Sequence, residues 1–272
     1  MKKLNLFTLL FVIALAQSCA TNPFTGKETL ALVPNSQILP SAFQQYTQFL
    51  TENKVIAGTT DAKRVETVGT KIKNAAEKWL NANGYQGYLN DYKWEYKLVE
   101  SKEVNAWCMP GGKIVVYSGI LPVTKDEAGL ATVLGHEVSH ALANHGAQRM
   151  STQLLEQLGQ AGVAMAVGNK SAETQQLAMQ AYGVTTQYGV TLPFSRSNET
   201  EADKIGLTLM AIAGYNPDQA IVFWERMSAN SGGQAPPEFA STHPSDATRI
   251  AALKALLPQA KAEAAKFGVV FK

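Results

Sequence analysis

The sequence carries almost no excess charge. Its 24 lysines and arginines face 22 aspartates and glutamates in 272 residues, which leaves a formal net charge of +2. Proteins that bind nucleic acid usually carry a basic stripe or patch, so we expect no nucleic-acid partner. The hydrophobic content of 46% and the charged content of 17% are ordinary for a folded domain, which argues against extensive disorder.

Long hydrophobic runs are scarce as well. The one clear run, from Leu4 to Ala16, is short for a bilayer-spanning helix and follows the basic residues Lys2 and Lys3. We therefore expect a secretory signal peptide at residues 1–18. No later stretch of the sequence is long and apolar enough to suggest a membrane span.

Only two cysteines are present, Cys19 and Cys108. The stretch LAQSC, which ends at Cys19, resembles a bacterial lipobox, in which the cysteine becomes the lipid-bearing first residue of the mature chain. The alternative is an ordinary cleaved signal followed by an incidental cysteine. If Cys19 carries lipid, Cys108 has no partner for a disulfide. Its apolar neighbours Trp107 and Met109 favour a small buried hydrophobe over a nucleophile.

These N-terminal features predict an exported protein of the cell envelope, anchored in a membrane through Cys19. Residues 19–40 would form the lipidated tether and residues 41–272 a single domain. No acidic residue directly follows Cys19. Under enteric sorting rules this favours the outer membrane, with the domain facing the periplasm.

In the first half of the chain, the apolar spacing changes from helical to strand-like. Helical spacing runs over residues 41–81, whereas residues 84–101 and 111–121 are typical of strands. Thr124 and Glu127 then form a capping-box pattern, which predicts a helix from about residue 125 to beyond residue 142.

The second half is predicted to be helical. Residues 151–194 indicate one or two helices with a loose connection, and another helix should begin near Asn198. Asn216 is expected to cap the next helix, and Ser245 or Asp246 to cap the last. Strands in the first half and helices elsewhere predict one helix-rich α+β domain.

Histidine is also rare, but its placement is concentrated. The chain has four histidines, and three of them fall in LGHEVSHALANH, residues 134–145. His136 and His140 are four apart, so on a helix both imidazoles project from one face and can bind one metal ion. Glu137 adjoins that face. This is the H-E-x-x-H pattern, typical of zinc held by two histidines with the glutamate as general base. The alternative, a coincidence on a surface helix, does not explain why the helix is otherwise hydrophobic.

A catalytic zinc site needs a third protein ligand, and the segment SRSNETEADKIG supplies carboxylates. Glu199 and Asp203 are four apart and share a helix face, whereas Glu201 lies about 200° around the helix from Glu199. We expect Glu199 to bind the metal and Asp203 to orient a ligating histidine, with Glu201 as the competing candidate ligand. If it is not a ligand, Glu201 would serve helix capping or the helix dipole. His145 is expected to face away from the other two histidines.

Four motifs occur in order along the chain: NAWCMPGGKIVVYSGIL, GHEVSH, NETEAD and STHPS ahead of RI. Together they resemble the zinc metallopeptidase family of the CAAX prenyl endopeptidase, HtpX and BepA, over about residues 60–255. The chain is most similar to the soluble exported branch of that family. The resemblance implies a gluzincin fold with a small sheet beside the H-E-x-x-H helix. It also implies one Zn²⁺ per chain, held by His136, His140 and Glu199.

The same resemblance implies further roles. His243 in STHPS would lie at the active site, either donating a hydrogen bond to the developing oxyanion or occupying the fourth zinc position. The strand around Val115 and Val116 would be able to pair with an extended substrate backbone. Arg249 is expected to be a structural clamp.

These residues predict a zinc-dependent metalloendopeptidase that hydrolyses peptide bonds in misfolded or unfolded envelope proteins. Zinc would activate a water molecule, and Glu137 would take its proton and later deliver it to the leaving amine. Residues 151–194 would be able to cover the cleft and restrict it to flexible chains. Two alternatives stay open: an envelope chaperone or assembly factor with a structural zinc, and an amidase or other zinc hydrolase of small substrates.

Overall fold

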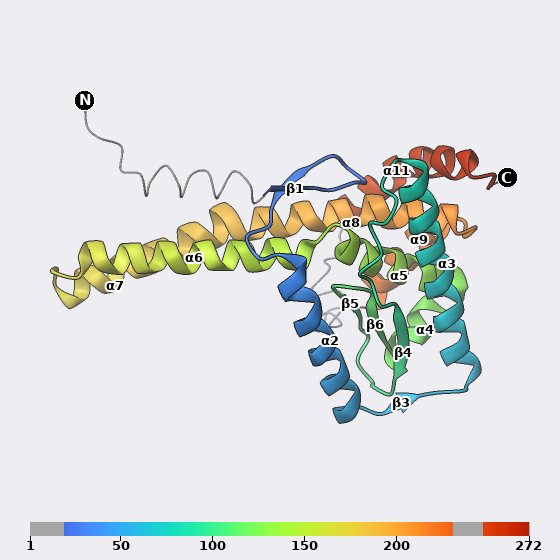
Figure 1. The fold of residues 1–272 in the computed structure, drawn as a ribbon, viewed down its shortest axis with the longest axis horizontal. Coiled ribbons are helices and arrows are strands. Elements are labelled where there is room, and N and C mark those ends of the chain that lie inside the picture. The colour runs from blue at the N-terminus through green and yellow to red at the C-terminus, as the bar shows by residue number, and fades with distance from the viewer. Residues whose placement is uncertain (1–18, 231–246, 272) are drawn as a thin grey trace.

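The computed structural model describes residues 19–230 and 247–271 (Figure 1). The strands are β1 (Cys19–Thr21), β2 (Glu28–Leu30), β3 (Val55–Ile56), β4 (Glu95–Val99), β5 (Ala106–Met109) and β6 (Lys113–Tyr117). The helices are α2 (Asn35–Glu52), α3 (Thr60–Ala82), α4 (Leu121–Thr124), α5 (Glu127–Leu142), α6 (His145–Val167), α7 (Ala172–Thr186), α8 (Leu192–Ile212), α9 (Asp218–Asn230) and α11 (Ala247–Lys266). A 3-10 turn η1 (Ser118–Ile120) precedes α4, and a π-helical turn η2 (Gln187–Thr191) joins α7 to α8. The predicted helix-rich α+β class is confirmed.

A small mixed sheet lies beside the central helices, in the strand order β3-β4-β6-β5. Strand β6 runs parallel to β4 and antiparallel to β5, and its residues Ile114, Val115 and Val116 are buried. The prediction that the strand around Val115 and Val116 pairs with substrate is therefore wrong, because both edges of β6 already bond to neighbouring strands. The edge strand on this side of the described sheet is β5.

Helix α5 forms the centre of the domain. It packs against α8, α3 and α9 and against strand β5. Its apolar residues Leu130, Leu134 and Val138 are fully buried. Burial on nearly every side explains why this helix is apolar outside the H-E-x-x-H residues, since a helix that is hydrophobic all round belongs in a core.

The start of α5 differs from the prediction. Lys125 adopts a left-handed φ of 63°, which separates the short helix α4 from α5. Asp126, rather than Thr124, caps α5, and its side chain accepts a hydrogen bond from the backbone amide of Gly129 at 2.8 Å. Thr124 instead ends α4 and donates to the carbonyl of Leu121. The capping-box pattern therefore placed the helix start about two residues early.

The long segment between α5 and the carboxylate cluster is a pair of helices, α6 and α7. They run side by side as a hairpin that projects away from the rest of the domain (Figure 1). Helix α7 buries no residue, and η2 continues it directly into α8. Helix α8 therefore begins at Leu192 instead of near Asn198, with Pro193 in its first turn, where a proline costs no hydrogen bond.

The N-terminal residues dock onto the domain. Strands β1 and β2 form an antiparallel hairpin, and Phe24 in its turn stacks on Trp79 of α3 with ring centroids 4.4 Å apart. Helix α2 begins at Asn35, inside the segment predicted as a tether. No helix among the described residues combines the length and the apolar character needed to cross a membrane. The predicted signal peptide at 1–18 and the predicted caps Ser245 and Asp246 lie outside the described residues.

Candidate active site

Three predicted side chains meet between α5 and α8. The Nε2 atoms of His136 and His140 are 3.0 Å apart, as expected for residues one helical turn apart. Glu199 of α8 places one carboxylate oxygen 3.2 Å from Nε2 of His136 and the other 3.3 Å from Nε2 of His140. In a tetrahedral site with bonds of about 2.0–2.1 Å, ligand atoms lie roughly 3.3 Å apart. The three side chains therefore fit a single metal ion, and their ligand atoms all lie within 4.8 Å of one another.

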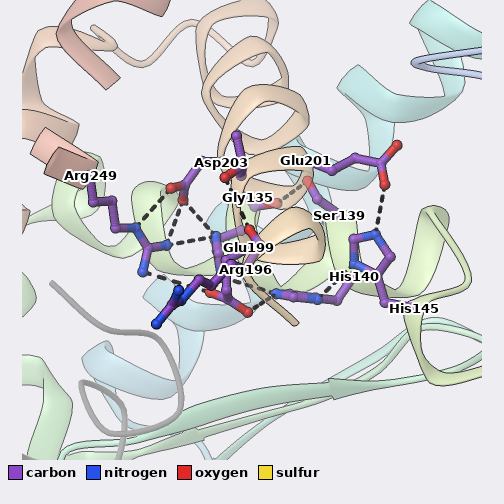
Figure 2. Close-up of polar contacts among 11 residues, drawn as sticks. Gly135, Ser139, His140, His145, Arg196, Glu199, Glu201, Asp203 and Arg249 are labelled. Atoms are coloured by element: carbon purple, nitrogen blue, oxygen red, sulfur yellow. Dashed lines mark hydrogen bonds and ion pairs between the residues drawn. The ribbon is translucent and has the colours of Figure 1, made fainter. Parts of the chain in front are cut away.

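Asp203 lies one turn after Glu199 on α8 and contacts the ring nitrogen of His136 that faces away from the ligand cluster. Its Oδ1 lies 2.9 Å from Nδ1 of His136. Arg249 of α11 donates to both oxygens of Asp203, at 2.8 Å and 2.5 Å (Figure 2). Its guanidinium lies 3.7 Å from the ring centroid of Trp224. An aspartate at Nδ1 fixes the proton there and leaves Nε2 as an electron-pair donor. Arg249 thus contacts His136 both through Asp203 and directly, since its Nη2 atom lies 3.2 Å from Nδ1 of His136.

The two histidines differ in their electrostatic surroundings. Burial lowers the pKa of His136, but the carboxylates of Asp203 and Glu199 outweigh it and raise that pKa to about 9. Burial lowers the pKa of His140 to about 3 and outweighs the opposing effect of Glu199, and the neighbouring His136 and His145 lower this pKa further. His140 is therefore neutral at physiological pH, which is the form that binds a metal, whereas His136 must release its Nε2 proton when a metal binds.

Glu137 lies next to this cluster on the wall of a cleft. Its side chain is buried, with 4% of the residue exposed. The cleft has a volume of about 430 Å³ and is lined by His140 and Glu199 as well as by β5, α6 and the start of α8. Glu137 thus adjoins the space where a substrate would meet the ligand cluster. A carboxylate in that position can accept a proton from water and return it to a leaving group.

His145 is not where the sequence predicted it. Asn144 adopts a left-handed φ of 54°, which ends α5 and turns the chain into α6, so His145 points back toward His140. Nδ1 of His145 lies 2.9 Å from Nδ1 of His140, and Nε2 lies 3.0 Å from Glu201 (Figure 2). Helical extrapolation failed here because the helix ends three residues before His145.

Glu201 also differs from its expected role. It is not a helix cap, because α8 begins nine residues earlier, at Leu192. It is buried and accepts hydrogen bonds from Asn22 and Thr25. Burial raises the pKa of Glu201, but His145, Thr25 and Lys27 lower it more and hold it at about 2. The pairing of His145 with Glu201 was missed. Asn144, a residue type that tolerates a left-handed φ, is a signal for the turn that brings His145 back toward His140.

Cys108 is half-buried on the cleft wall, and burial together with the charge of Glu137 raises the pKa of its thiol. An elevated pKa disfavours the nucleophilic thiolate. Cys19 begins β1, the first described element. His243 lies outside the described residues.

The fold and this site define a class of protein. An H-E-x-x-H helix whose histidines meet a glutamate from a second helix is the arrangement of a metallopeptidase site. The profile of peptidase family M48 matches residues 68–257, most of the described chain. The chain belongs to peptidase family M48, and thus to a family of metalloendopeptidases.

Known relatives include proteases of mitochondria and of bacteria. The chain is 40% identical over 176 residues to the mitochondrial metalloendopeptidase OMA1 of Schizosaccharomyces pombe, covering 64% of this chain and 49% of the relative. It is 30% identical over 262 residues to the mitochondrial metalloendopeptidase OMA1 of Homo sapiens, covering 94% of this chain and 49% of the relative. It is 30% identical over 184 residues to the β-barrel assembly-enhancing protease of Escherichia coli, covering 64% of this chain and 37% of the relative. The matched regions span about half or less of each of these relatives.

Proposed function

We propose that the chain is a zinc-dependent metalloendopeptidase of the bacterial cell envelope that hydrolyses peptide bonds in misfolded or unfolded envelope proteins. The observation that carries this proposal is the meeting of His136, His140 and Glu199 at a cleft whose wall also holds Glu137. Membership of family M48 supports the peptidase activity, and the E. coli relative is by its name a protease of the bacterial cell.

Zinc is the metal that suits this donor set. Two imidazoles and one carboxylate are a ligand set that catalytic zinc uses, with a fourth position left for water or substrate. A Zn²⁺ ion held by His136, His140 and Glu199 supplies Lewis-acid chemistry, which lowers the pKa of water and polarises a carbonyl group.

The chain's own residues supply the proton transfer and the alignment. Glu137 takes a proton from the attacking water and passes it to the leaving amine. Asp203, held by Arg249, keeps the proton of His136 on Nδ1 and so fixes the direction of its Nε2. Cys108 stays a neutral thiol beside Glu137 and takes no part in proton transfer.

The edge strand β5 offers a place for the substrate backbone. It lines the cleft along residues 106–108, and among the described strands it bonds only to β6. An extended peptide can add to such an edge by main-chain hydrogen bonds, which need no particular side chains. Only an unfolded or flexible segment can adopt this form. That requirement supports misfolded proteins as substrates.

The decisive experiment compares Glu137→Gln with the parent chain. We expect the variant to keep its metal and to cleave a labelled unfolded protein about 10²- to 10⁴-fold more slowly, because the base is lost. Glu66→Gln is the matched control, since Glu66 is exposed on α3. Cleavage by Glu137→Gln at the parental rate would refute the mechanism. Cellular function without cleavage would favour the chaperone or assembly factor. Activity on non-peptide amides alone would favour an amidase.

His243 is proposed to act at the same site, in one of two ways. A hydrogen bond to the developing oxyanion predicts that His243→Phe lowers kcat. A self-inhibitory fourth zinc ligand predicts that the same variant is more active than the parent. Parental activity in His243→Phe would exclude both roles.

Export and lipid attachment at Cys19 form the cellular part of the proposal. They are supported by the N-terminal sequence, in which a basic start and an apolar run precede LAQSC. Metabolic labelling with a radioactive fatty acid tests this. We expect the parent, but not Cys19→Ser, to be labelled and to fractionate with the outer membrane. An unlabelled parent would refute the anchor without affecting the peptidase assignment.

A further inference from the structure

A buried chain of polar contacts runs from the N-terminal hairpin to His140. Glu201 lies 3.0 Å from Nε2 of His145, and Nδ1 of His145 lies 2.9 Å from Nδ1 of His140 (Figure 2). His145 and Glu201 are only 5% and 7% exposed. The H-E-x-x-H spacing predicts neither residue, and neither takes part in the proposed hydrolysis.

The contacts determine where each proton sits. An ionised carboxylate only accepts hydrogen bonds, so Nε2 of His145 must carry a proton to donate to Glu201. A neutral imidazole then has an unprotonated Nδ1, which can only accept. The proton shared with His140 must therefore sit on Nδ1 of His140. That tautomer leaves Nε2 of His140 with its electron pair directed at the ligand cluster.

In His136, as in His140, the contacts place a proton on Nδ1, but here the carboxylate contacts the ring directly. Asp203 accepts directly from Nδ1 of His136, which leaves Nε2 of that ring as the electron-pair donor. Each histidine of the cluster is thus backed by a carboxylate of α8, one directly and the other through an intervening imidazole. Carboxylates and carbonyls that hold a ligating histidine in this way fix its orientation and raise its basicity.

Glu201, the carboxylate that contacts His145, is itself contacted by residues outside the peptidase motifs. Asn22 donates to Glu201 at 2.9 Å, and the hydroxyl of Thr25 donates to the same oxygen. Lys27 lies 3.7 Å from the other oxygen. These residues form the turn between β1 and β2, closed by hydrogen bonds between the backbones of Asn22 and Lys27 and of Gly26 and Asn22. The turn orients Glu201 and supplies its positive neighbour.

We propose that Glu201 and His145 are positioning residues for His140, and that the turn of residues 22–27 completes this arrangement, so that the metal site includes the N-terminal segment next to Cys19. The inference rests on the proposed function, because it takes His140 to be a metal ligand. Docking of the turn and binding of the metal then favour each other, since a coupling between two sites acts equally in both directions.

Equilibrium zinc affinity of the full chain, measured by competition with a chromophoric chelator, tests the proposal. His145→Phe removes the acceptor for His140 and should weaken zinc binding by about 10- to 100-fold. His145→Gln should restore most of the affinity, because its side chain can still accept from His140 and donate to Glu201. The visible spectrum of the Co²⁺-substituted protein should shift in His145→Phe and return in His145→Gln. A merely structural role would leave that spectrum unchanged.

The turn is tested with a matched pair of threonines. Thr25→Val and Asn22→Ala each remove one hydrogen bond to Glu201, and each should weaken zinc binding by about 2- to 10-fold. Thr21→Val is the control, because Thr21 is exposed and bonds to Glu28 instead. Urea unfolding of the metal-free proteins separates a loss of affinity from a loss of folding.

The outcomes separate this inference from the proposed function. If His140→Ala and Glu199→Ala bind zinc as the parent does, the ligand set itself is wrong. If those variants lose zinc while His145→Phe binds normally, only the positioning role falls. If His145→Phe loses affinity and Thr25→Val matches Thr21→Val, the N-terminal turn is not part of the site.

Discussion

Gly135 of α5 and Gly206 of α8 lie backbone to backbone where the two helices cross. A Cβ on Gly206 would come within 2.8 Å of both the carbonyl carbon of Gly135 and the amide nitrogen of His136. A Cβ on Gly135 would come within 2.9 Å of the carbonyl oxygen of Gly206. The helix that carries His136 and the helix that carries Glu199 can approach closely only because both residues lack a side chain.

The first prediction follows from this crossing. Gly206→Ala forces α8 away from α5, because backbone atoms cannot move aside as a side chain can. We expect a loss of about 1–3 kcal/mol in the free energy of unfolding, together with weaker metal binding as Glu199 moves away from His136. Urea unfolding and chelator competition measure the two effects. Gly162→Ala in α6 meets no atom within 4 Å and should instead stabilise the helix by about 0.5–1 kcal/mol. Unchanged metal affinity in Gly206→Ala would show that the crossing does not set the site.

The part of the site that could be predicted from sequence depends on helix geometry alone. His136 and His140 share a face because residues four apart always do, and Glu199 and Asp203 share one for the same reason. The preference for Glu199 over Glu201 rested on the face that Glu199 shares with Asp203, with Glu201 about 200° away, and on the family resemblance. The cluster in the structure has these members because both pairs stay inside uninterrupted helices.

The parts that were missed depend on single backbone angles and on distant partners. The left-handed φ of Asn144 turns His145 back onto His140, and the left-handed φ of Lys125 moves the start of α5. Glu201 bonds to partners 179 and 176 residues away, Asn22 and Thr25 in the N-terminal turn. The burial of β6 between two strands follows from sheet order, which local periodicity cannot reveal.

The second prediction concerns the buried pair of Asp203 and Arg249. Removing the guanidinium leaves the Asp203 carboxylate buried without its cation, and such losses cost about 3–5 kcal/mol. Arg249→Ala should therefore lower the free energy of unfolding by that amount and weaken metal binding through His136. Arg149→Ala, at an exposed arginine of α6, should change stability by no more than about 0.5 kcal/mol. Equal effects of the two substitutions in urea unfolding would contradict the assignment of Arg249 as a clamp.

The third prediction concerns metal removal. A ligand that binds only the folded state stabilises it by an amount set by its concentration relative to Kd, about 4 kcal/mol at a thousandfold excess. Stripping zinc with a chelator should therefore lower the Tm of the parent chain, and adding zinc back should restore it. His140→Ala should have the same Tm with chelator as with zinc. A zinc-dependent Tm in that variant would place the metal elsewhere.

The last prediction uses Cys108 to report the charge of Glu137. Burial, followed by the negative charge of Glu137, raises the pKa of the thiol, so at pH 8 the thiolate fraction is smaller than in a free cysteine. In a Cys19→Ser background, where Cys108 is the sole thiol, alkylation should be at least about tenfold slower than for free cysteine and should accelerate only as the pH rises above 9. Glu137→Gln removes the charge and lowers the pKa, which should speed alkylation at a given pH, whereas Glu66→Gln should not. If Glu137→Gln leaves the alkylation rate unchanged across this pH range, Glu137 carries no charge beside the cleft. It could not then act as the base that the proposed hydrolysis requires.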